Sequence, residues 1–429
     1  MTRHVVILLL LILCGTAFGH DYAPGAKQTQ PILLKGGTLF TISDGVKTGY
    51  DLLMVDGRIA EIAENIKPPE NTKVIDIAGK HVYPGLIAAG TRIGLEEISA
   101  VRATVDTREV GRATPEVRSH IAYNPDSEII PTIRSNGIAY AQIVPQGSML
   151  RGRSCLLNLD AWTKEDAAEK LEVGLHLAWP AAAVRTTWYE TRTPEEQKKA
   201  MAESRRQLNS LFDEARAYAI AKAADPDIDV DLRWEAMLPI WTGDLPLFVH
   251  AGDYRQIRQA VEFCSERGLK MILVGGEEAW KVTDLLSRND IPVVYCNSHD
   301  LPMRSDDDYD LAYKIPRLLS EGGVRFCLGS QSSWPARNMP FDAGQAVAFG
   351  LDRDVALRAM TLTPAEMMGV DRNIGSLEVG KKASVIVSDG DIMDHLTHNV
   401  THMFIEGRSV DLDNKHKELY RKYRDRKTD

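Results

Sequence analysis

The middle of the chain alternates short apolar runs with longer amphipathic stretches. The apolar runs predict buried strands at residues 138–144, 247–250, 270–274, 291–295 and 324–328. Apolar positions at helical spacing predict helices over residues 254–267, 277–288 and 312–322. Strands that alternate with helices in this way favour a parallel sheet with helical crossovers.

The length and rhythm of this region predict a TIM-type (β/α)8 barrel, an α/β fold, over residues 84–371. A doubly wound open sheet is the structural alternative. It is disfavoured because no Gly-x-Gly-x-x-Gly follows a first strand.

Both ends of the chain show a different pattern, in which short extended stretches alternate with glycine turns. These stretches are residues 32–40, 51–62 and 74–83 near the start, and 375–387 and 402–410 near the end. Neither group is large enough to form a secure sheet alone. We therefore expect a small β-sandwich domain built from residues 31–83 and 372–412, with the barrel inserted between them.

Two charged stretches predict helices on the outside of the molecule. Residues 194–223 are rich in Glu, Lys, Arg and Ala, and we interpret them as a helical insertion outside the barrel. Residues 413–429 form a basic tail, which we interpret as an exposed helix. A solvated charge run explains this tail better than a binding arm does.

The N-terminus is typical of a secretory signal peptide. Arg3 and His4 precede the apolar run from Val5 to Leu13, and small residues stand at Ala17 and Gly19. This pattern predicts a signal peptide at residues 1–19 and an exported protein, periplasmic or extracellular. The alternatives are an uncleaved anchor, for which the apolar run is short, and a lipoprotein at Cys14, which the bulky residue before it disfavours.

The net charge limits the classes of binding partner, and the cysteine spacing bears on disulfide formation. The chain has 60 acidic and 51 basic side chains, a net charge of −9, which argues against nucleic acid and against anionic membrane after cleavage. The cysteines beyond the leader are widely spaced and favour buried free thiols, although an exported protein could form a disulfide. They are Cys155, Cys264, Cys296 and Cys327.

Four short motifs resemble those of the amidohydrolase superfamily, most closely its imidazolonepropionase-like branch. They are Pro84-Gly85-Leu86-Ile87, the Thr-x-x-Pro-Ala step within 356–366, the turn at 375–381 and the hairpin at 405–408. Residues 95–241 carry no motif that matches. The resemblance implies a metal-dependent hydrolase that acts on carbon–nitrogen bonds other than peptide bonds, such as those of cyclic amides.

Most of the metal ligands that this resemblance implies are replaced. Gly90 and Arg92 stand where the first strand would carry two histidines, and His250 matches the ligand on the fifth strand. The next histidine falls near residues 275–276, and the catalytic aspartate aligns with Gln331. One imidazole cannot supply the three or four ligands that zinc needs, and an amide is not a base. We therefore expect no metal cofactor, unless these ligands are misaligned.

Among these replacements, Arg92 is the one that could bind an anion, because a guanidinium binds carboxylates and phosphates. It would project at the barrel face that carries active sites. One hypothesis is that the barrel mouth binds a small anionic ligand, held by Arg92, His250, Gln331 and His299. The other is that Arg92 pairs with Glu96 or Glu97 and closes the site.

The remaining histidines are weighed by their surroundings. His250 precedes Ala251-Gly252 at a strand end, which favours a catalytic role over that of a core histidine. His299 lies in an acidic loop that lacks the glycine and distal glutamate of a calcium loop, so solvated carboxylates are favoured there. His176 and His120 are interpreted as structural.

The sequence therefore supports two functional hypotheses. The first is an exported amidohydrolase-like enzyme with a degenerate metal site and altered, metal-free chemistry, in which His250 is catalytic. The second is a non-catalytic pseudoenzyme that binds a small anion in the inherited mouth. The small-molecule ligand is common to both, and a homo-oligomer is possible.

Overall fold

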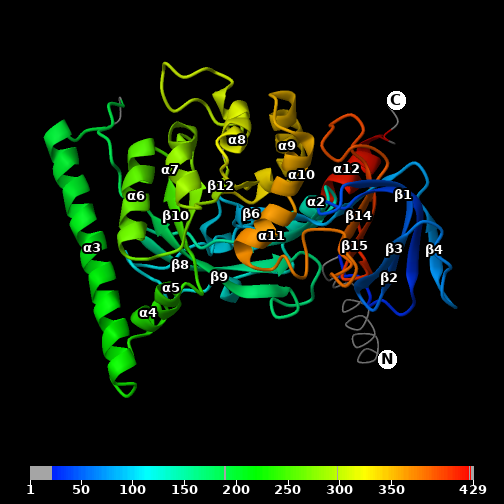
Figure 1. Ribbon diagram of the computed structural model, residues 1–429, viewed down its shortest axis with the longest axis horizontal. Coiled ribbons are helices and arrows are strands. Elements are labelled where there is room, and N and C mark those ends of the chain that lie inside the picture. Colours follow the sequence, from blue (N-terminus) through cyan, green and yellow to red (C-terminus); the bar gives the residue numbers. More distant parts are fainter. Residues whose placement is uncertain (1–21, 188–189, 297, 425, 427–429) are drawn as a thin grey trace, which may run out of the picture.

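Two eight-stranded sheets organise the chain. The computed structural model describes residues 22–187, 190–296, 298–424 and 426, so the signal peptide predicted at residues 1–19 lies outside the described residues. The second sheet lies at one end of an elongated molecule, the barrel lies in the middle, and a long helix lies at the far end (Figure 1).

The first sheet is the predicted TIM-type barrel. Its strands follow one another in the order β13-β12-β11-β10-β9-β8-β7-β6. A parallel bridge between Ala89 and Gly329 joins the first strand to the last. The strands are β6 (Leu86–Thr91), β7 (Ile138–Ile143), β8 (Leu150–Asn158), β9 (Ala168–Ala178), β10 (Leu247–Ala251), β11 (Met271–Gly275), β12 (Val293–Tyr295) and β13 (Phe326–Leu328).

One barrel strand runs against the others. β8 is antiparallel to both β7 and β9, whereas the remaining paired neighbours are parallel. The expectation of a wholly parallel sheet is therefore wrong at β8. A parallel connection needs a dozen or more residues, and only residues 144–149 and 159–167 separate these three strands. The resulting meander brings polar side chains from three strands together.

Helices cover the outside of the barrel between the strands (Figure 1). The helix predicted over 254–267 is present, as is the one over 312–322. The one over 277–288 begins as a 3-10 turn, Ala279–Val282, before its α-helical part. The helices are α2 (Ile129–Arg134), α3 (Pro194–Ala224), α4 (Leu232–Glu235), α5 (Leu238–Thr242), α6 (Tyr254–Glu266), α7 (Thr283–Arg288), α8 (Leu311–Glu321), α9 (Met339–Ala348), α10 (Arg353–Ala359), α11 (Leu362–Met368) and α12 (Lys415–Arg424).

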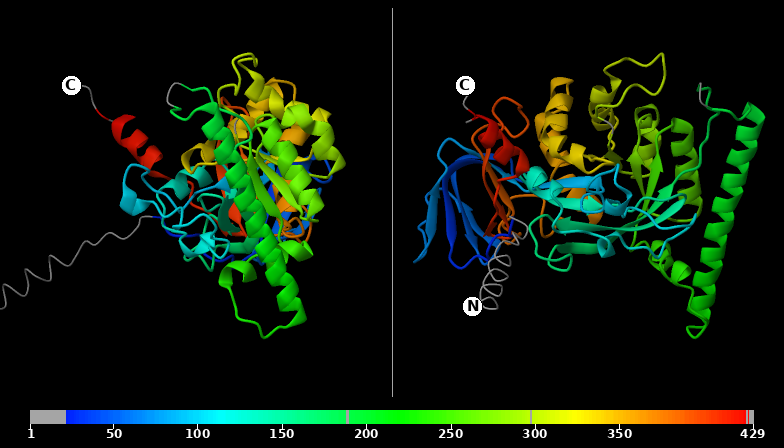
Figure 2. Two further views of the ribbon diagram at one scale, coloured as in Figure 1. Left: turned by 90° about the vertical axis from the view of Figure 1, so that its left-hand side faces the viewer. Right: turned by 180° about the vertical axis from the view of Figure 1, so that it is seen from behind.

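Helix α3 packs on the outer surface at the end farthest from the second sheet (Figure 2). Thr193 and Glu196 form a capping box at its start, which satisfies free backbone N–H groups. Its buried side chains include Leu208 and Phe212, and the Phe212 ring meets Phe263 of α6 edge-on at 5.0 Å. The helix predicted outside the barrel is thus present, and a narrow apolar stripe that was not predicted holds it there.

The second sheet combines strands from both ends of the chain, as predicted. Its order is β16-β15-β14-β5-β1-β2-β3, and β4 pairs with β1. β14 lies antiparallel to β5, with Ile386 opposite Tyr83. The strands are β1 (Ile32–Phe40), β2 (Val46–Val55), β3 (Arg58–Ala63), β4 (Lys73–Asp76), β5 (His81–Pro84), β14 (Val385–Ser388), β15 (Val400–Ile405) and β16 (Arg408–Ser409).

The cysteines and the C-terminal tail follow the predictions in the described residues, except that Cys296 is only half-buried. Cys155, Cys264 and Cys327 are buried and Cys296 is half-buried, all as free thiols. Helix α12 in the basic tail buries none of its side chains. Within the described ranges, no helix combines the length and apolar character needed to cross a membrane.

Candidate active site

His250 points into the barrel from the end of β10. Phe248, two residues earlier, belongs to the apolar cluster that fills the barrel interior. Side chains two apart on a strand face the same side. The His176 ring of β9 stacks on Phe248 at 4.8 Å and lies 5.2 Å from the His250 ring. Both imidazoles therefore sit on top of the apolar core, inside the barrel.

A chain of hydrogen bonds connects His250 to the other side of the barrel. The Gly90 N–H donates to Gln142 Oε1 at 3.1 Å, and Gln142 Nε2 donates to Ser154 Oγ at 3.0 Å. Ser154 Oγ lies 2.8 Å from His176 Nε2, and His176 Nδ1 lies 2.9 Å from His250 Nε2. Gln142, Ser154 and His176 are buried, so water does not compete for these bonds.

Two proton arrangements satisfy this network, because a neutral imidazole carries its proton on either nitrogen. In the first, Ser154 Oγ donates to the Gly174 carbonyl at 3.4 Å and accepts from His176 Nε2, His176 Nδ1 accepts from His250 Nε2, and His250 Nδ1 is unprotonated. In the second, Ser154 Oγ donates to His176 Nε2 at 2.8 Å, His176 Nδ1 donates to His250 Nε2, and His250 Nδ1 carries the proton. In both arrangements His250 Nδ1 is buried without a partner among the described residues.

Burial holds both imidazoles in the neutral form. It lowers the pKa of His176 well below its usual value, and the charge of Arg151 lowers it further. The pKa of His250 is also lowered well below the usual value, first by burial, then by Arg151 and then by His176. Neither ring is therefore charged at pH 7.

Arg151 supplies the fixed positive charge of the site. It comes from β8 and is partly buried, and burial lowers its pKa, yet a guanidinium stays protonated. Its Nε is buried without an acceptor, and the side chain has no ion-pair partner within the described part of the chain. An unpaired guanidinium beside two neutral histidines is suited to a carboxylate.

Arg92, the arginine singled out from the sequence, is already engaged. It forms an ion pair with Glu96 at 3.1 Å, and a long contact of 3.5 Å joins it to Ser332 Oγ. This ion pair matches the second of the two alternatives for Arg92. Its role in ligand binding stays a prediction.

In the described residues, neither Gln331 nor His299 is hydrogen-bonded to His250 or His176. Gln331 is exposed. His299 Nε2 lies 2.8 Å from Asp342 Oδ1 of α9, and the His299 side chain is 56% exposed. The structure thus brings His250 together with His176, Ser154 and Gln142, rather than with these two predicted partners by hydrogen bonding.

The acidic loop after β12 is satisfied by cations of the chain itself. Lys314 pairs with Asp310 at 2.6 Å and with Asp308 at 3.4 Å, and Asp307 lies 3.8 Å from Lys281. Asp308 and Asp310 share Lys314, whereas Asp307 lies near Lys281, so the three carboxylates do not converge on one point. This agrees with the interpretation of the loop as a solvated acidic segment.

The backbone at the replaced ligand positions disfavours histidine. Gly90, Gly275 and Gly276 have φ angles of +77°, +96° and +71°, a region that residues with a Cβ rarely adopt. Within the described ranges, no three His, Cys, Asp or Glu side chains are grouped to hold a metal ion. His250 and His176 direct nitrogen atoms at each other, and Arg151 adds positive charge. The residues present do not fit the family's metal site.

Comparison with known proteins identifies the family. Residues 312–410 match the model of the Amidohydrolase family. An imidazolonepropionase of Alkaliphilus metalliredigens is 25% identical over 86% of this chain and 92% of its own. Amidohydrolase tasK of Hapsidospora irregularis is 21% identical over 80% of this chain, which spans only 38% of that protein.

The fold agrees with these matches. The crystal structure of an amidohydrolase from Thermotoga maritima superposes with a TM-score of 0.79, at 24% identity, over 89% of this chain and 99% of that one. Residues 312–410 thus match the Amidohydrolase family, and the chain as a whole shares the fold of an amidohydrolase.

Sequence reasoning did not single out Arg151, and it interpreted His176 as structural. Both lie in residues 95–241, where no family motif matches. His176 lies within a glycine-started apolar run, which is equally typical of a core strand. A polar residue on every strand of the meander (Gln142, Ser154 and His176) was the available signal, but it has meaning only once the three strands are known to be neighbours.

Proposed function

We propose that this chain is a hydrolase of carbon–nitrogen bonds outside peptides, and that its substrates are cyclic amides that carry a carboxylate. Family membership supports the reaction class. The observation that carries the proposal is the unpartnered Nδ1 of the neutral His250 ring beside the unpaired guanidinium of Arg151. The proposal takes the arrangement in which this nitrogen is unprotonated.

In this proposal His250 is the general base. Its Nε2–H donates to His176 and fixes the ring, while its Nδ1 accepts a proton from the water that attacks the amide carbon. The ring then gives this proton to the amide nitrogen as the carbon–nitrogen bond breaks. Ser154 and Gln142 hold His176 in turn. No step is routed through a metal ion, because the side chains present do not fit one.

Arg151 binds the substrate carboxylate and tunes the base. In the free protein its charge lowers the pKa of His250. A bound carboxylate would offset that charge, and the pKa of His250 would rise toward the range of an effective base. Substrate binding and activation of the base are thus coupled through one guanidinium.

A non-catalytic binding protein is the second candidate. The lowered pKa of His250 and the amide at Gln331 favour it, because both make proton transfer harder. The same Arg151 would then hold a small organic anion without turnover.

The test is a turnover screen with dihydroorotate, imidazolonepropionate and related carboxylate-bearing cyclic amides. For a compound that is hydrolysed, His250→Ala should lower kcat/KM by about 100-fold or more. Arg151→Met should mainly raise KM. His395→Ala, at an exposed loop position, is the matched control. Tight binding without turnover would select the second candidate, and neither binding nor turnover would reject both.

We also propose that the protein is exported, on the strength of the leader at residues 1–19. Mass spectrometry of protein from the native host should find a mature chain that begins after Gly19. An intact N-terminus would contradict this.

A further inference from the structure

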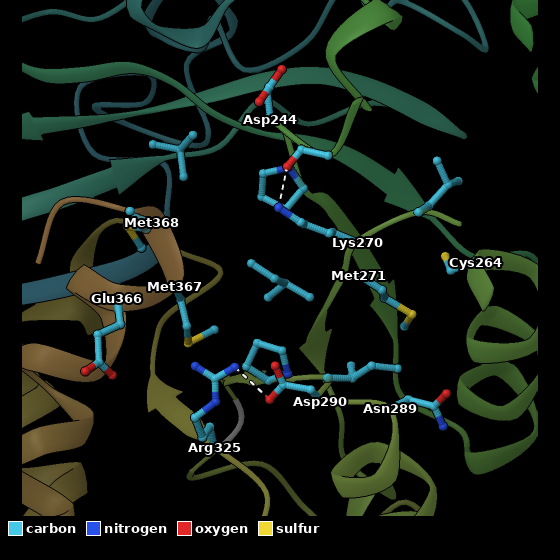
Figure 3. Close-up of a pocket in the computed structure, with 18 of the residues that line it drawn as sticks. Asp244, Cys264, Lys270, Met271, Asn289, Asp290, Arg325, Glu366, Met367 and Met368 are labelled. Carbon is cyan, nitrogen blue, oxygen red and sulfur yellow. Dashed lines mark hydrogen bonds and ion pairs between the residues drawn. The ribbon is translucent and has the colours of Figure 1, made fainter. Parts of the chain in front are cut away.

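A cavity of about 560 Å³ lies at the end of the barrel opposite to His250 (Figure 3). It is lined where β10, β11, β12 and β13 begin, by residues such as Pro246, Met271 and Arg325. Pro246 precedes His250 by four residues, which separates the two by roughly 13 Å along the strand. The volume is within the usual range of small-molecule sites.

Two lysines line this cavity without a carboxylate partner in the described part of the chain. Lys170 Nζ donates to the Met368 carbonyl at 2.8 Å, and Lys270 Nζ donates to the Gly243 carbonyl at 2.7 Å. An ammonium has three donors, so each lysine retains two. Lys170 is half-buried, and burial is the cause that lowers its pKa, with no acid nearby to raise it.

Two of the three acidic residues that line the cavity form ion pairs with arginines. Asp290 pairs with Arg325 at 2.9 Å, as Figure 3 shows, and Glu366 pairs with Arg358 at 2.6 Å. Asp244 accepts a hydrogen bond from the Thr242 hydroxyl at 2.6 Å and has no ion-pair partner in the described part of the chain. The two free lysines outnumber this one carboxylate, so the uncompensated charge of the cavity is positive.

The rest of the lining is largely apolar. Met367 and Met368 come from the end of α11, and Val173 and Ile272 come from β9 and β11. In Figure 3 the two methionines lie on the α11 side, across from Lys270 and Met271 on the strand side. Methionine adapts its shape to different apolar groups. The cavity thus offers an apolar wall together with two available ammonium groups.

We propose that this cavity is a second ligand site, which binds an organic anion with an aliphatic body and one carboxylate. The carboxylate is held by Lys170 and Lys270, and the aliphatic body packs on Met367 and Ile272. The site is independent of the barrel mouth and of the hydrolase activity proposed above.

Isothermal titration of the chain from residue 20 onward with octanoate tests this site. Octanoate should bind, and octanamide and acetate should bind at least about tenfold more weakly, because each lacks the charge or the apolar body. Lys170→Met and Lys270→Met should each weaken octanoate binding about tenfold, and His250→Ala should not change it.

Lys198→Met, an exposed lysine of α3 away from the cavity, is the control. Lys270 is exposed, so its variant reports on binding even if Lys170→Met fails to fold. Octanamide binding as tightly as octanoate, octanoate binding unchanged in Lys270→Met, or binding lost in His250→Ala would overturn the proposal, as would no binding of octanoate.

Discussion

His176 Nδ1 lies 2.9 Å from His250 Nε2, and burial keeps both rings neutral. The histidine that the sequence presents as the one remaining metal ligand is therefore half of a hydrogen-bonded pair. The Nδ1 atom of His250 is buried without a partner among the described residues. Its Nε2 atom is hydrogen-bonded to His176, and the hydrogen bond to Ser154 fixes the orientation of His176. Such a pair suits proton transfer better than metal binding.

Removal of the Ser154 hydroxyl tests whether the buried chain positions His250. Ser154→Ala leaves His176 Nε2 without its hydrogen-bond partner, which should destabilise the fold by about 1–3 kcal/mol. With the tautomer of His250 less fixed, kcat should fall by about tenfold, a part of the roughly 10²–10⁴-fold that a positioned base contributes. KM should stay unchanged.

Nitrogen chemical shifts of the His250 ring give the decisive measurement, because a merely structural serine would leave them in place. Ser210→Ala, at an exposed position of α3, is the matched control. Unaltered His250 shifts in folded Ser154→Ala protein would contradict the assignment.

Acidification should destabilise the protein through the same pair. The pKa values of both histidines are lowered in the folded state, so below about pH 6.5 the unfolded chain binds more protons than the folded one. Stability is full above that pH and is lost as the pH falls, by up to about 1.4 kcal/mol per pH unit for each histidine.

Urea unfolding at pH 7.0 and 5.5 measures this loss. His176→Asn should reduce the loss by about 1 kcal/mol relative to the native chain, because one shifted group is gone. His395→Ala should not, since His395 lies exposed in a surface loop. The same loss in all three proteins would show that the pair does not control the acid sensitivity.

Metal content gives a third test. We expect purified protein to contain no stoichiometric zinc, and any turnover to survive dialysis against a chelator. The reason is the donor set, in which His250 and His176 bind each other and Arg151 repels a cation. Element analysis that finds one or two zinc ions per chain, with activity restored by zinc alone, would mean that the site rearranges to accept them.

The parts of this structure that local patterns encode were predictable. The strand that ends at His250 and the helix α6 after it each follow from a continuous stretch of sequence. The ion pair of Arg92 with Glu96 was also predictable as one of two alternatives. Its partners lie only four residues apart in the sequence.

The histidine pair was not predictable in this way. It depends on β8 running antiparallel, so that Ser154 meets His176, and no periodicity reports the direction of a strand. The role of Arg151 could not be predicted either. It depends on whether an acidic side chain lies near the guanidinium in the fold, and the sequence around Arg151 does not show this.

The junction between the barrel and the second sheet contains a buried ion pair. Asp160, just after β8, lies 2.7 Å from Arg134 of α2, and their side chains are 1% and 5% exposed. The Asp160 carboxylate also accepts from the Gly25 N–H at 3.1 Å and lies 3.7 Å from Arg408 of β16. One carboxylate thus connects the barrel, the second sheet and the N-terminal segment.

Asp160→Asn should therefore lower the free energy of unfolding by about 3–5 kcal/mol, because it leaves the buried guanidinium of Arg134 without a counter-charge. Glu203→Gln, which removes an exposed ion pair with Arg206 on α3, should leave the free energy of unfolding nearly unchanged, because solvent screens exposed pairs. Urea midpoints of the two variants and the native chain make the comparison. The large effect of Asp160→Asn is expected only if the junction unfolds together with the barrel. Equal urea midpoints for the two variants would show instead that the second sheet separates before the barrel unfolds.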